Sequence, residues 1–183
     1  IYSATSPEAL QDMFEQKRQR LEQKESVLKD AISSLKEKER QDLSYSNYKY
    51  FEGLQGVKSM WREINDLISS KHPIKIHTGT RDSYKKLVPF LDEHQRVRAE
   101  KNVYEQMIFP KEDKKLAEER SEDLVDIRFM PLRNEAEWGV FGESLYMHHI
   151  TGTPPRGFLI HDEKFAETFR HVFEQLWEKS SQQ

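Results

Sequence analysis

The sequence predicts an α/β protein in which a long polar helix precedes a sandwich of helices and a sheet of mixed direction. From Glu8 to about Asp42 the chain contains neither glycine nor proline, and good helix formers dominate it. Beyond residue 50, short apolar runs suited to strands alternate with runs of helical period. Such alternation is typical of α/β domains. We therefore expect residues 1–50 to form a long helix with its connector, and residues 51–183 to form an α/β domain.

Composition narrows the classes of protein to which the chain can belong. Of its 183 residues, 33% are charged, yet the formal net charge is only −3, which argues against a surface built mainly to neutralise nucleic-acid phosphates. The chain has no cysteine, which excludes disulfides and thiolate metal sites. No apolar run suits a membrane span or a signal peptide, so we expect a cytoplasmic protein with no membrane partner. Because the chain begins with Ile1 rather than Met, we expect it to be a fragment with more protein upstream.

The first helix carries a narrow apolar stripe, and Ser6 and Pro7 suit its start. Lys17 and Lys24 fall where a second apolar seam would lie, so the pattern is coiled-coil-like rather than a full coiled coil. Two interpretations remain open: a helix lying on its own domain, or a helix pairing with a second copy. We favour a homodimer, because so long a stripe needs a partner. The expected dimerisation residues are Leu10, Phe14, Leu21, Leu28, Ile32 and Leu35.

The first half of the domain is predicted element by element. A tyrosine-rich connector at 43–50 leads to a helix with an apolar face, which Pro73 stops. Ile74 and Ile76 alternate with polar neighbours, as in a strand. A helix follows from Asp82 and Ser83, which suit its N-cap. The pattern then indicates a strand at 104–109, a short charged helix at 111–121 and a strand at 124–130.

The second half is predicted to be mostly antiparallel. Residues 138–141 and 145–150 indicate a hairpin that turns at Gly142-Glu143. Residues 158–160 form a short edge or closing strand. The last helix is capped by Asp162, and its apolar stripe indicates packing against the sheet: Phe165, Phe169, Val172, Phe173 and Leu176.

The first strand of the domain leads into a turn of small residues just before a helix. In open α/β sheets, ligands gather beyond the carboxyl ends of the strands. Free amides and the helix dipole at the helix start favour an anion, and Arg81 adds a fixed charge. The alternative is that Thr78-Gly79-Thr80 is only a turn. The candidate ligand-binding residues are His77, Thr78, Gly79, Thr80, Arg81, Arg133 and His149.

No motif in the chain indicates catalysis. H-E-x-x-H, G-x-S-x-G, Walker and dinucleotide-binding patterns are absent. His148 and His149 are adjacent on a predicted strand and point to opposite faces, so we expect at most one of them to face a cavity. The β–α order is similar to one half of the phospholipase D fold, whose signature is H-x-K, four residues and Asp. No histidine here is followed two positions later by Lys. We expect no enzymatic activity, no metal and no cofactor.

The order of several loose motifs resembles the TrmB-type transcriptional regulators. They are the run from Tyr2 to Pro7 before the long helix, Tyr50-Phe51-Glu52-Gly53 with Gly56-Val57, Gly142-Glu143-Ser144-Leu145-Tyr146, Gly157-Phe158-Leu159-Ile160, and Phe173-Glu174-Gln175-Leu176-Trp177. The resemblance implies a phospholipase-D-like, catalytically empty effector domain after a dimerising coiled coil. It also implies that DNA is bound only through an upstream winged helix-turn-helix outside this chain.

These observations favour the dimerisation and effector-sensing part of a DNA-binding transcriptional regulator, with a small-molecule effector. The first alternative is a divergent phosphodiesterase or nuclease of phospholipase D type, in which His148 or His149 takes part. The second is a pure protein-interaction module without a small ligand. An enclosed pocket near Thr78 to Arg81 distinguishes the effector hypothesis from the interaction module.

Overall fold

The computed structural model describes residues 7–41, 47–79, 81–121, 123–132 and 134–181. In the first helix, the side chains of residues 7–10, 12 and 35–41 lie outside this description. The chain divides into two compact units, Ile1–Ser46 and Asn47–Gln183, and each is described by itself.

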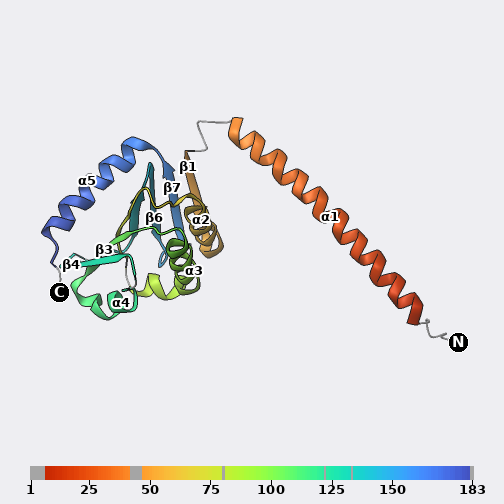
Figure 1. The fold of residues 1–183 in the computed structure, drawn as a ribbon, viewed down its shortest axis with the longest axis horizontal. Helices are drawn as coiled ribbons and strands as arrows, with labels where there is room; N and C mark the ends of the chain where they lie inside the picture. Colours follow the sequence, from red (N-terminus) through yellow and green to blue (C-terminus); the bar gives the residue numbers. More distant parts are fainter. Residues whose placement is uncertain (1–6, 42–46, 80, 122, 133, 182–183) are drawn as a thin grey trace. The chain divides into compact units, whose positions relative to one another are not determined.

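The first unit is a single helix, α1 (Pro7–Gln41), of 35 residues (Figure 1). Its range matches the expected long helix. The described apolar side chains of the stripe are open to solvent: Phe14 is 69% exposed and Leu21 67%, and Leu28 and Ile32 are exposed as well. Leu10 and Leu35, also expected to contribute to dimerisation, lie among the side chains that are not described. The pairing of two such helices stays a prediction.

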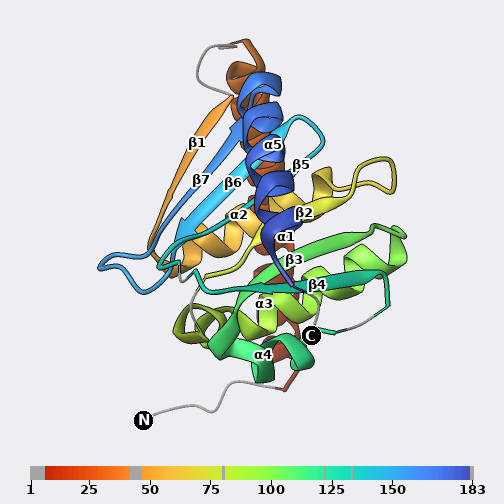
Figure 2. The same cartoon turned by 90° about the vertical axis from the view of Figure 1, so that its left-hand side faces the viewer.

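The second unit contains a sheet of mixed direction, as expected. Its seven strands lie in the order β1-β7-β6-β5-β2-β3-β4 among the described residues (Figure 2). The neighbours β2, β3 and β4 are parallel, whereas β5, β6, β7 and β1 pair antiparallel. The strands are β1 (Tyr48–Glu52), β2 (Ile74–His77), β3 (Glu105–Pro110), β4 (Val125–Met130), β5 (Glu137–Phe141), β6 (Ser144–His149) and β7 (Arg156–His161).

Helices cover both faces of this sheet, which makes the unit a sandwich. Figure 1 shows α2 (Gly53–Leu67) and α3 (Arg81–Glu100) on one side and α5 (Glu163–Lys179) on the other. The larger core lies under α2 and α3 and contains the fully buried Met60, Ile64 and Ile74. The smaller core lies under α5 around Phe173. A 3-10 turn, η1 (Lys111–Asp113), and a short helix, α4 (Lys114–Glu119), connect β3 to β4.

The strand β1 was not predicted, because its sequence was interpreted as a polar connector. Its side chains alternate between exposed and half-buried, and its order comes from pairing with β7 rather than from its own apolar pattern. The predicted domain boundary at residues 50 and 51 therefore falls within a strand. The expected N-cap of α5 is present, since the Asp162 carboxylate accepts hydrogen bonds from the N–H groups of Lys164 and Phe165.

Candidate functional site

A small cavity lies at the carboxyl end of β2, between the sheet and the helices α2, α3 and α4. Its volume of about 20 Å³ gives room for a single water-sized group. Most of its walls are apolar. The lining residues are Trp61, Ile76, Thr78, Gly79, Tyr84, Leu91, Met107, Phe109, Leu116, Arg120 and Glu137.

Glu137 is the acidic group of this cavity, and neighbouring strands hold its carboxylate in place. The β5–β6 register sets it opposite His148. The Tyr146 hydroxyl donates to Glu137 Oε1 at 3.1 Å, and His148 Nε2 lies 3.2 Å from the same oxygen. The N–H of Gly79 donates a longer bond of 3.4 Å to Oε2. Burial raises the pKa of Glu137, but the neighbouring His148, the Arg120 charge and the Gly79 N–H outweigh it, so the pKa is lowered.

Arg120 is the basic group of the cavity, and its charge lowers the pKa of both the Glu137 and the Glu105 carboxyl groups. The residue is only 5% exposed, and its guanidinium lies over the Tyr84 ring, 5.5 Å from the ring centre. Its Nε has no hydrogen-bond partner within the described residues. The cavity therefore contains a buried N–H donor without an acceptor, beside an acidic and a basic side chain of opposite charge.

A second buried arginine, Arg98, shows what a structural arginine looks like in this domain. It is fully buried, and its Nε lies 3.7 Å from the Glu105 carboxylate. Its guanidinium also donates to the carbonyl oxygens of Val103 and Asp123 at 2.8 Å and 2.9 Å. Burial raises the pKa of Glu105, but the His94 hydrogen bond and the charges of His94, Arg120 and Arg98 lower it to about 2. Both charges of this pair are therefore satisfied internally.

The alternation of β2 separates the candidate ligand residues. Thr78 and Gly79 line the cavity. His77 faces the opposite side of the sheet, where its ring stacks on Trp138 and its Nδ1 contacts Asn134. Burial, opposed by the Glu137 charge, lowers the pKa of His77 to about 4. His77 and Thr78 therefore cannot line one site together.

The remaining candidate residues lie outside the cavity or outside the described residues. Arg81 begins α3 with an exposed side chain, and its Nε lies 3.6 Å from the Asp113 carboxylate. His149 is exposed, and the neighbouring buried His148 is the one that contacts Glu137. Thr80 and Arg133 lie outside the described residues. Of the candidate set, the structure brings Thr78 and Gly79 together at the cavity.

Sequence reasoning missed Arg120, Glu137 and Tyr84. Arg120 stands in a charged run that was interpreted as a short solvated helix, and Glu137 precedes a predicted strand. One signal pointed in the right direction: the alternation of β6 implied that one of His148 and His149 faces inward. Which one faces inward depends on which face of the sheet α2 covers, and that is a tertiary property.

A larger open hollow of about 560 Å³ lies at the other end of the sheet, beside the β5–β6 turn. Ser144 Oγ lies 2.9 Å from His161 Nδ1, and His161 Nε2 lies 3.5 Å from Glu63 Oε1. This order resembles a hydrolase triad. However, Lys49 Nζ lies 2.7 Å from the same Glu63 oxygen and holds the carboxylate more closely than the histidine does. We interpret the group as a polar bridge that ties β6 and β7 to α2.

Two classes of site find no support in the part of the chain that the structure describes. No group of three or more His, Asp or Glu side chains is arranged to hold a metal ion. No described helix has both the length and the apolar character needed to cross a bilayer.

Comparisons with known proteins support the fold. No protein-family model matches the chain, and no curated protein matches it. The solved structure of TrmBL2, an archaeal chromatin protein with a novel mode of DNA binding, is similar with a TM-score of 0.50 and 12% identity. That match covers 98% of this chain and 73% of TrmBL2.

Two further solved structures are also similar. NucT from Helicobacter pylori has a TM-score of 0.54 at 8% identity, over 73% of this chain and 96% of that one. Nuc from Salmonella typhimurium, a phospholipase D family member, has a TM-score of 0.50 at 8% identity, over 73% of this chain and 95% of that one. At such identities the likeness shows the fold alone. The chain has a mixed α/β fold of the kind found in phospholipase D family proteins and in TrmBL2.

Proposed function

We propose that this chain is the dimerisation and effector-sensing part of a DNA-binding transcriptional regulator, and that it does not catalyse a reaction. The observation that carries the proposal is the exposed apolar stripe of α1, in which Phe14, Leu21 and Leu28 recur every seven residues with exposed fractions of 59% to 69%. A stripe of this spacing suits a second copy of the same helix.

Two further observations support a regulator. The likeness to TrmBL2, a DNA-binding chromatin protein, spans nearly the whole chain, including α1. The domain shares its fold with phospholipase D family nucleases but lacks their H-x-K-x4-D signature. In the proposed mechanism, a ligand held in the domain favours one arrangement of two paired helices, and thereby of two DNA-binding segments joined to them.

The dimer is tested by replacing both Leu21 and Leu28 with Glu. Burying a leucine side chain contributes about 1.5–3 kcal/mol, so a pair of glutamates in each helix should abolish pairing at micromolar concentration. Light scattering should then give the mass of one chain instead of two. The matched control is Gln16→Glu with Gln23→Glu, which adds the same charge to the opposite face and should remain dimeric. An unchanged mass in the leucine variant would refute the dimer.

The alternative is a divergent phosphodiesterase of phospholipase D type, and the contact of His148 with Glu137 favours it over other enzyme classes. Hydrolysis of bis(p-nitrophenyl) phosphate should be measured for the wild type, His148→Ala and Glu137→Gln. We expect no turnover in any of the three. Turnover that disappears in both variants would establish the enzyme instead. A dimer that binds neither effector nor diester would favour the pure interaction module.

A further inference from the structure

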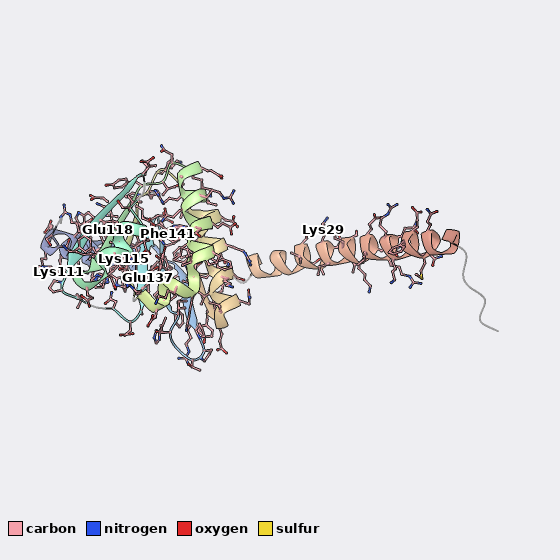
Figure 3. The ribbon with its side chains drawn as sticks, turned by 90° about the horizontal axis from the view of Figure 1, so that it is seen from below. Lys29, Lys111, Lys115, Glu118, Glu137 and Phe141 are labelled. Atoms are coloured by element: carbon pink, nitrogen blue, oxygen red, sulfur yellow. The ribbon has the colours of Figure 1, made fainter. Side chains whose placement is uncertain are left out.

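The two edges of the sheet differ in what covers them. At the β4 edge the tail of the chain adds a bridge, because the Phe129 N–H donates to the Ser181 carbonyl oxygen and the Ser181 N–H donates back, both at 2.9 Å. Inner strands have two neighbours, as β5 has in β2 and β6; Figure 3 labels its ends, Glu137 and Phe141, within the domain. At the other edge, β1 pairs with β7 alone among the described residues (Figure 2). One side of β1 is therefore open to a further strand.

The hydrogen bonds to β7 show which backbone groups of β1 face the open side. The Gly53 N–H donates to the Pro155 carbonyl oxygen, which lies directly opposite it in the β1–β7 register, at 2.8 Å. In an antiparallel pair, positions that bond in this way alternate with positions whose N–H and C=O groups point away from the neighbouring strand. By this alternation, the backbone groups that point to the open side are those of Tyr48, Tyr50 and Glu52.

The open side of β1 lacks the features that usually keep an edge strand from pairing. Such strands are protected by proline, by bulges or by lysine side chains. The strand β1 contains no proline, and the Nζ of its lysine, Lys49, lies 2.7 Å from Glu63 Oε1 on α2. Its exposed side chains include Tyr48 and Tyr50, which are 50% and 51% exposed, and the Tyr50 ring lies 5.2 Å from the Phe158 ring of β7. Aromatic residues favour strand pairing, so this edge is suited to receive another strand.

The sequence of β1 fits a second copy of itself. A two-fold axis through Tyr50 sets the outward-facing residues against each other in an antiparallel ladder, with Tyr50 opposite its own copy. On either side of the axis, Tyr48 lies opposite Glu52 of the partner subunit. No like charges meet in this register, because Lys49 lies opposite an aromatic residue, Phe51 of the partner subunit. We propose that β1 pairs with β1 of a second copy of this chain, which joins the two sheets into one.

This contact depends on α1, because a strand of five residues offers little area. Stable protein interfaces bury about 1,200–2,000 Å² in total, which a single pair of short strands does not reach. Only residues 42–47 lie between the end of α1 and the start of β1. Two α1 helices paired in parallel would therefore hold both copies of β1 on short tethers, at an effective concentration on the order of 1 mM. The inference rests on the proposed function, and it adds a direct contact between the two domains.

Cysteine cross-linking tests the contact directly, because the natural chain contains no cysteine. Tyr50→Cys places a thiol opposite its own copy, with Cα atoms about 5.5 Å apart, which is within reach of a disulfide. The matched control Phe158→Cys changes an exposed aromatic residue one strand further from the axis, so its two copies lie about 14 Å apart. Under mild oxidation with copper phenanthroline, we expect at least about tenfold more covalent dimer from Tyr50→Cys. Equal yields from the two variants would overturn the proposal.

Hydrogen exchange of the unaltered protein gives a second test with an internal control. The Tyr50 N–H belongs to the open side, whereas the N–H groups of Lys49 and Phe51 face β7. Pairing should slow exchange at Tyr50 about tenfold or more in the wild type. In the Leu21→Glu, Leu28→Glu variant this protection should disappear, while Lys49 and Phe51 remain protected. Equally fast exchange at Tyr50 in both proteins would contradict the contact.

The outcomes separate this contact from the proposed function. A wild type that is dimeric by light scattering, but shows neither selective cross-linking nor slow exchange at Tyr50, would overturn the β1 contact and leave the α1 dimer intact. Selective cross-linking at Tyr50 in a protein that stays dimeric after the leucine-to-glutamate changes would keep the β1 contact and refute the pairing through α1.

Discussion

The helix α1 and the α/β domain use their apolar residues in opposite ways. In the domain, Val57, Met60 and Ile64 are fully buried, whereas in α1 Phe14 and Leu21 are 69% and 67% exposed. A helix with an uncovered stripe obtains little stability from its own chain, because most helical stability in proteins comes from packing. The domain is therefore expected to fold by itself, and α1 to depend on a partner. Substitutions in the domain should change its stability. Substitutions in the stripe of α1 should change the mass of the assembly in solution, from two chains to one.

The largest effect on stability is expected from Arg98→Met. The variant leaves the fully buried Glu105 carboxylate without its arginine and removes the hydrogen bonds to Val103 and Asp123. Leaving a buried charge uncompensated costs about 3–5 kcal/mol. Urea unfolding should show this loss in the midpoint with little change in slope. Under conditions in which the variant is folded, its mass in solution should equal that of the wild-type dimer.

Two controls sharpen this result. Arg98→Met with Glu105→Leu removes both charges and should recover part of the loss, because replacing a buried pair costs less than breaking it. The Leu21→Glu, Leu28→Glu variant should leave the urea midpoint of the domain unchanged. A midpoint that moves with the α1 variant would contradict the separation of the two units, and a loss below about 1 kcal/mol in Arg98→Met would contradict the role of the pair.

The next effect is a loss of stability in mild acid that originates in His77. Burial lowers its pKa from 6.5 to about 4, so the unfolded chain takes up a proton that the folded domain resists. Stability is therefore fully present above about pH 6.5 and falls as the pH drops toward 4. One pKa unit corresponds to about 1.4 kcal/mol, so the loss between pH 7.5 and pH 5 is about 2 kcal/mol.

The measurement is urea unfolding of the wild type and His77→Leu at both pH values. The variant should lose this part of the pH dependence. Glu105 does not interfere, because its pKa is lowered from 4.5 to about 2 and the stability it contributes is lost only as the pH falls below about 4.5. Identical pH dependence in the two proteins would show that His77 does not resist protonation.

Sequence patterns predicted the elements whose periodicity is local and missed the properties that depend on tertiary contacts. The helical period around Met60 and Ile64 and the cap at Asp162 depend only on residues close to them in the sequence, and the structure confirms both. The strand β1 was missed because pairing with β7 orders a polar segment. For the site, the Thr78-Gly79 turn was found from its position between a strand and a helix. Arg120 was not, because a charged side chain in a charged run gives no sign that it is buried.

The smallest predicted effect concerns Gly53, where β1 gives way to α2. Its φ of +74° lies in the left-handed region, and an added Cβ would meet no atom within 4 Å. Gly53→Ala therefore tests backbone strain without a steric clash, and should cost about 1–2 kcal/mol. Gly53→Asn should cost less, since asparagine tolerates this region better. Thermal unfolding should rank Gly, Asn and Ala in falling order of Tm. Because β1 belongs to the domain, the variants should keep the wild-type mass; a change of mass with little change in Tm would instead link this junction to the pairing of α1.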